Sequence, residues 1–77
     1  MTDFKVEFEN RFYTVFLESS TATSAEIVDV KIIMYNTVYN IYKNRTNNTW
    51  HNHISKFELS KGLLSAIGAK LDAYLKI

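Results

Sequence analysis

The sequence predicts an α+β fold in which an antiparallel sheet of four to five strands carries one C-terminal helix on one face. Apolar and charged residues alternate from Phe4 to Glu9, which is the period of a strand with one buried side. Residues 27–35 are rich in β-branched side chains, which favour strands. Leucine and isoleucine recur at helical spacing over residues 61–75, which predicts a helix with one apolar face.

The chain is predicted to form a single domain over residues 1–77. A chain of 77 residues can hold only one hydrophobic core. It contains no cysteine, so neither disulfides nor a cysteine-based zinc site can stabilise it, and packing or a second subunit must do so. The net charge of +1, spread along the chain, argues against charge-driven binding of nucleic acid.

Neither a secretion signal nor a membrane segment is visible in the sequence. Charged and apolar residues alternate at the N-terminus, unlike the continuous apolar run of a signal peptide. No stretch reaches the roughly 18 apolar residues of a membrane span. We therefore expect a cytoplasmic protein that does not bind membranes.

Residues 4–18 are predicted to form the first hairpin, with Asn10-Arg11 as its turn, because Asn tolerates a positive φ. A two-residue turn there pairs Glu9 with Phe12. The face of this hairpin that is predicted to enter the core carries Phe4, Val6, Phe8, Tyr13, Val15 and Leu17.

The middle of the chain is predicted to continue the sheet, because apolar runs alternate with polar, turn-forming segments. The expected elements are a polar loop over 19–24, a strand over 27–35, a turn at Asn36-Thr37, a strand over 38–43, a loop over 44–48 and a short strand over 49–54.

Two N-caps compete for the start of the helix. Residues 55–58 match a capping box, with Ile54 and Leu59 placed as a hydrophobic staple. Ser60 is the alternative cap. In either case residues 61–75 are helical. The face predicted to pack on the sheet carries Leu63, Leu64, Ile67, Leu71, Tyr74 and Leu75.

A second helical stripe consists of small residues, namely Gly62, Ala66, Ala69 and Ala73. Small residues allow another backbone to approach closely, so this stripe could hold a second helix across a dimer axis. Alternatively, the stripe lies at the margin of the contact between helix and sheet, and alanine is there because it favours helices.

The outer face of the sheet is the first candidate binding surface. The predicted hairpin places Phe12 and Phe16 on the face that one helix cannot cover. An exposed apolar patch larger than a few hundred Å² would mark an interface, unless the sheet curls over it or the register differs. The neighbouring strands are expected to extend the patch with Ile33, Tyr35, Tyr39 and Ile41.

The second candidate surface is the segment 42–53, which combines aromatic, basic and short polar residues. This composition is typical of binding hot spots. Trp50 is the only tryptophan, and it either takes part in binding or turns inward to close the core. The proposed contact residues are Tyr42, Arg45, Trp50, His51 and His53.

Catalytic, metal and cofactor sites are not predicted. No nucleophile motif, phosphate-binding glycine loop or zinc-protease motif occurs. His51 and His53 would point to the same side of a strand, as a pair of metal ligands could, but zinc needs three or four ligands. Metal-assisted activity at this histidine pair is therefore only an alternative.

Single-stranded nucleic-acid binding is another alternative, because aromatic residues on a sheet can stack on bases. The residues concerned are Tyr35, Tyr39, Tyr42 and Trp50, with Lys43 and Arg45 nearby. The function we expect instead is that of a non-enzymatic protein-binding or regulatory module, a homodimer that also binds another protein.

Overall fold

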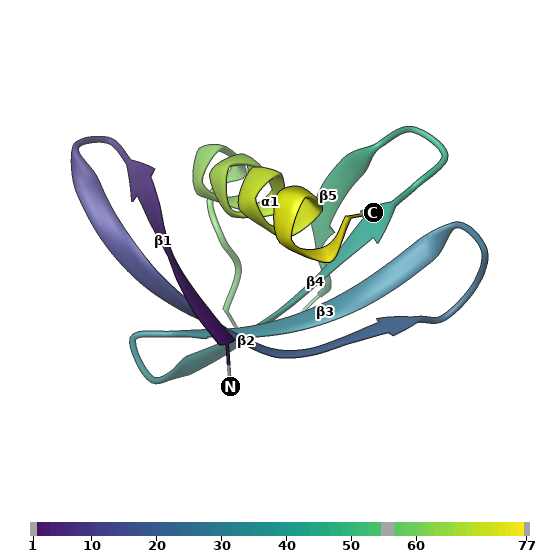
Figure 1. Ribbon diagram of the computed structural model, residues 1–77, viewed down its shortest axis with the longest axis horizontal. Helices are drawn as coiled ribbons and strands as arrows, with labels where there is room; N and C mark the ends of the chain where they lie inside the picture. Colours follow the sequence, from purple (N-terminus) through teal and green to yellow (C-terminus); the bar gives the residue numbers. More distant parts are fainter. Residues whose placement is uncertain (1, 55–56, 77) are drawn as a thin grey trace.

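The computed structural model describes residues 2–54 and 57–76, and it confirms the predicted α+β fold. Five antiparallel strands form one sheet in chain order. The sheet curls, and the helix lies inside the curl between the two end strands (Figure 1). In this part of the chain, no helix has the length and hydropathy needed to cross a membrane. The elements are β1 (Thr2–Phe8), β2 (Arg11–Ala22), β3 (Ile27–Met34), β4 (Thr37–Asn44), β5 (Thr49–Asn52) and α1 (Lys61–Leu75).

The turn of the first hairpin is Glu9-Asn10, one residue before the predicted position. Both residues have left-handed φ angles, 53° and 63°, as expected for the type I′ turn that fits the twist of a hairpin. Phe8 therefore pairs with Arg11, and the predicted pairing of Glu9 with Phe12 was wrong. The two registers place the same side chains on each face, so the predicted core face is correct.

β2 is longer than predicted, because Ser19–Ala22 continues the strand and pairs with β3. The predicted loop over 19–24 was wrong at these residues. The register shifts between Leu17 and Ser19, and such a bulge bends the strand. The connection to β3 is restricted to residues 23–26. Here the Ser24 hydroxyl accepts hydrogen bonds from the main-chain N–H groups of Glu26 and Ile27.

The hairpin of β3 and β4 also turns one residue earlier than predicted. Tyr35-Asn36 forms the turn, with φ angles of 53° and 58°, in place of Asn36-Thr37. The short final strand is present as Thr49–Asn52, which is shorter than the predicted 49–54.

The helix begins at Lys61 as predicted, and Ser60 is its N-cap, accepting a hydrogen bond from the N–H of Leu63 at 3.4 Å. Of the alternative capping box, Ser55 and Lys56 lie outside the described residues. Ile54 is fully exposed, so it does not form the predicted staple with Leu59.

The inner face of the sheet and one face of α1 form a single core. Most of the helix face predicted to be buried is buried, but Tyr74 is 51% exposed. The buried apolar residues are Val6, Val15, Val28, Val30, Ile32, Met34, Ile41, Leu59, Leu63, Leu64, Ile67 and Leu71.

Candidate functional site

The outer face of the sheet carries an apolar row that crosses three strands. Phe16 of β2 pairs with Ile33 of β3, and Ile33 pairs with Val38 of β4. Cross-strand partners share a face of the sheet, so these three side chains lie side by side. Phe12 lies four residues from Phe16 on the same face of β2. We call Phe12, Phe16, Ile33 and Val38 the outer apolar row.

Most of this row is open to solvent. Phe12 is 68% exposed, Val38 is 44% exposed and Phe16 is 37% exposed, whereas the helix covers only the opposite face (Figure 1). The row agrees with the predicted surface at Phe12, Phe16 and Ile33.

Two other residues expected on the outer face were assigned wrongly. Tyr39 pairs with Ile32, and Ile41 pairs with Val30, so both point to the inner face. The two-residue turn pairs odd-numbered positions of β3 with even-numbered positions of β4. The outer face therefore carries odd-numbered residues of β3 but even-numbered residues of β4. Tyr39 consequently packs against the core, and it is not a surface contact residue.

Further along the outer face, Tyr42 lies against both histidines. Its ring is stacked with His51, at 5.1 Å between centroids, and tilted against His53 at 4.7 Å. His53 Nε2 is hydrogen-bonded to the carboxylate of Asp29. Because a carboxylate only accepts hydrogen bonds, the His53 Nε2–H is the donor.

His51 has a different partner, the hydroxyl of Thr49. Thr49 Oγ1 donates to Asn47 Oδ1 at 2.5 Å, so its single proton is used there. The 2.7 Å contact between Thr49 Oγ1 and His51 Nε2 therefore requires the imidazole to donate. Each histidine is positioned by its own acceptor, and they do not converge on a shared ligand point.

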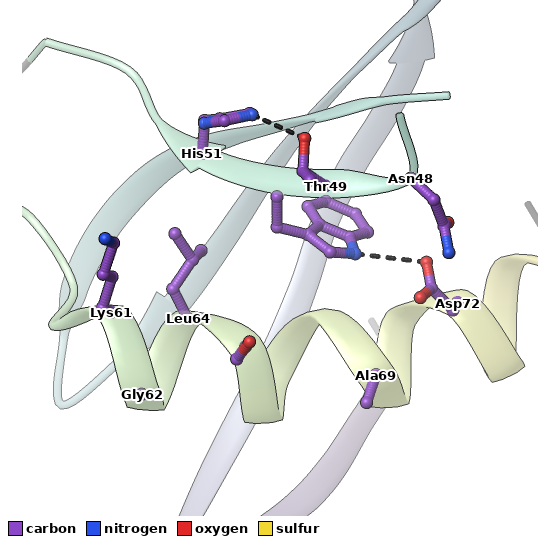
Figure 2. A pocket seen from close by; sticks show the side chains of 10 residues that line it. Asn48, Thr49, His51, Lys61, Gly62, Leu64, Ala69 and Asp72 are labelled. Carbon is purple, nitrogen blue, oxygen red and sulfur yellow. Dashed lines mark hydrogen bonds between the residues drawn. The ribbon is translucent and has the colours of Figure 1, made fainter. Parts of the chain in front are cut away.

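Trp50, whose role the sequence left open, faces inward. It is half-buried and packs against the core, and its indole N–H donates to Asp72 Oδ1 at 3.1 Å (Figure 2). The same Asp72 oxygen lies 2.5 Å from Lys43 Nζ. The inward arrangement makes Trp50 part of the contact between sheet and helix.

Lys43 is buried, which the sequence did not predict. It is 2% exposed, on the inner face between its strand partners Val28 and Trp50. Buried charges require a partner, and Asp72 of α1 supplies one. The alternation of Tyr39, Ile41 and Lys43 along β4 was the signal that could have placed this lysine inside.

A groove of about 570 Å³ is lined by residues of β5, α1 and the turn before β5. Its walls carry both apolar and polar side chains, and the Asp72 carboxylate lies at one end (Figure 2). Among residues 2–54 and 57–76, no cluster of three or more potential metal ligands is present.

The segment 42–53 does not form the single contact surface that its composition suggested. Arg45 lies exposed in the turn after β4, where its main-chain N–H donates to the Glu26 carbonyl at 2.7 Å. Tyr42 and the histidines occupy the outer face, and Trp50 occupies the inner one.

The small-residue stripe of α1 points away from the middle of the sheet. Ala69 and Ala73 are exposed, and Ala66 is half-buried. Gly62 lies under the ring of Phe8, whose Cζ would be only 2.6 Å from an added Cβ. Gly62 is thus in an intrachain contact, whereas the other three remain partly open.

Comparison with known proteins gives no relative on which to base a function: no family model, no curated protein and no solved structure matches the chain.

Proposed function

We propose that this chain is a non-enzymatic protein-binding module that works as a homodimer and binds another protein through the outer apolar row. The observation that carries the proposal is the row itself, formed by Phe12, Phe16, Ile33 and Val38 on the face that α1 does not cover.

The residue types in and around the row are similar to those of protein interfaces. Aromatic side chains are enriched in the centre of interfaces, and polar side chains form the rim. Here Phe12 and Phe16 lie beside the exposed, charged Lys5, Glu7 and Lys31. A partner with an apolar centre and a charged rim would fit this face.

The geometry gives less support to the two alternatives. Stacking of a nucleic-acid strand needs aromatic rings on one open surface, but Tyr39 and Trp50 face α1 whereas Tyr42 faces outward. The metal alternative needs ligands that converge. His51 and His53 instead make hydrogen bonds to Thr49 and Asp29, respectively.

Photo-crosslinking tests the proposal because it captures a partner whose identity is not known in advance. A photoreactive phenylalanine analogue replaces Phe12 in cells that make the protein, and one discrete adduct with another protein is expected. Adding Phe16→Glu should reduce the adduct at least tenfold, because burial of an unpaired charge opposes binding.

Ala25→Glu is the control, because it adds the same charge at an exposed position in the connection between β2 and β3, away from the row. It should leave the adduct unchanged. Equal adduct yields from the Phe16→Glu and Ala25→Glu proteins, both folded by circular dichroism, would refute the outer apolar row as the binding surface.

A further inference from the structure

We propose that a second copy of this chain pairs antiparallel with β1, so that two five-stranded sheets join into one continuous sheet. The inference rests on the homodimer proposed above and assigns it a surface. It uses the edge of the sheet and leaves the outer apolar row open in both copies.

The main chain of β1 has hydrogen-bonding groups directed away from β2. The Glu9-Asn10 turn makes Phe8 and Arg11 the first hydrogen-bonded pair. Because hydrogen-bonded and non-hydrogen-bonded pairs alternate in an antiparallel ladder, the N–H and C=O groups of Asp3, Lys5 and Glu7 point to the free edge. No hydrogen bond from another described residue reaches them.

The side chains of these three residues form an alternating charge pattern on the exposed outer face. Two copies related by a two-fold axis can place Lys5 opposite Glu7 of the second copy, and this contact then occurs twice. Opposite charges directly across a strand pair are stabilising. The charges of Lys5 and Glu7 are therefore complementary across the axis.

The same register also matches the inner face. It places Val6 opposite Val6 of the second copy, and Phe4 opposite Phe8. Aromatic pairs across strands are favourable. Phe4 and Phe8 are only partly buried within one copy, so they have surface left to bury.

Helix α1 runs along β1, so the helices of the two copies lie on the same side of the joined sheet. Gly62 contacts Phe8 at one end of β1, and Tyr74 donates a hydrogen bond to Thr2 at the other. Between these two contacts, Ala66 is small and half-buried, whereas Lys70 is exposed and its long side chain can extend into solvent.

The other edge of the sheet is less suited to pairing. β5 has only four residues, and the side chain of Asn52 forms hydrogen bonds to both the N–H and the C=O of Leu59. The chain that leads into α1 thus covers part of this edge. β1 is the longer of the two edges, with seven residues.

Sedimentation or light scattering over a hundredfold dilution series tests the inference. The unaltered chain should be a dimer. Lys5→Glu places like charges opposite each other twice, and we expect dimerisation to weaken about tenfold to a hundredfold. Arg45→Glu is the control, because it makes the same change of charge at an exposed position in the turn after β4, away from β1, and it should leave the dissociation constant unchanged.

A double charge reversal identifies the register. Lys5→Glu combined with Glu7→Lys restores opposite charges across the axis, so it should recover the dimer. Recovery by Lys5→Glu with Asp3→Lys instead would overturn this register. A dimer that Lys5→Glu does not weaken would overturn the pairing through β1, but not the homodimer. A monomer at every concentration would overturn both the edge and the homodimer, and it would leave the outer apolar row to the crosslinking test.

Discussion

On the β5 side, α1 is joined to the sheet by directional polar contacts: Asp72 binds both Lys43 and Trp50, and Asn52 binds the main chain of Leu59 just before the helix. On the β1 side, the helix has an apolar contact between Gly62 and Phe8 and one exposed hydrogen bond at its far end.

This difference separates a side that fixes the helix from a side that remains adaptable. Partly buried polar contacts have strict geometry, and losing one partner is costly. An apolar contact with a half-buried ring can adjust at little cost. We therefore expect substitutions on the β5 side to reduce the free energy of unfolding more than matched substitutions on the β1 side, which is the side proposed to meet a second copy.

The largest effect is expected at Asp72. Asp72→Ala removes the carboxylate that lies 2.5 Å from the ammonium of the buried Lys43, and breaking a buried ion pair from one side is strongly destabilising. Since Asp72 is 34% exposed, we expect a loss of about 2–3 kcal/mol, somewhat below the values for fully buried pairs. Urea unfolding measures it.

Lys43→Met is the control for that prediction. It keeps most of the side-chain volume and removes the buried charge, while Asp72 remains near water and the Trp50 donor. The loss should be less than half that of Asp72→Ala. Equal losses would mean that the pair contributes through packing and not through charge.

Alanine substitutions at the two helical glycines allow a direct comparison of the two sides. A methyl group at Gly68 would overlap the indole of Trp50 near its attachment point, whereas at Gly62 it would meet the far end of the Phe8 ring. Alanine favours the helix by about 1 kcal/mol over glycine. We expect Gly68→Ala to cost about 1–3 kcal/mol net through overpacking.

Gly62→Ala should change stability by less than about 1 kcal/mol, because the Phe8 ring can move aside while the helix gains propensity. Thermal unfolding of both variants measures the contrast. A larger loss for Gly62→Ala than for Gly68→Ala would contradict the assignment of β1 as the adaptable side.

The fold was predictable because its signals are local. However, the turns between β1 and β2 and between β3 and β4 were each predicted one residue too late. Asn10 and Asn36 each mark a turn, but both occupy its second central position. Asn tolerates positive φ at either position, so the residue type alone does not fix the register. The error shifted the pairing by two and preserved the faces of the first hairpin.

Features that depend on distant partners were less accessible from the sequence. The polar run Ser19–Ala22 is a strand because β3 pairs with it, and its composition indicated a loop. The ion pair of Lys43 and Asp72 joins residues 29 positions apart, which no local pattern connects. The outer apolar row was predicted in part, since Phe12 and Phe16 needed only the alternation within one strand.

Two hydrogen-bond deletions, one on each side, give a further comparison, and one of them has the smallest expected effect. Asn52→Ala removes both hydrogen bonds to the main chain of Leu59, which is 6% exposed, and unsatisfied buried groups are costly. We expect a loss of about 1–2 kcal/mol. Tyr74→Phe removes only the exposed bond to Thr2, and its effect should stay within about 0.5 kcal/mol. Urea unfolding of the two variants at one protein concentration gives the comparison. Equal losses would show that the β1 side fixes the helix as firmly as the β5 side.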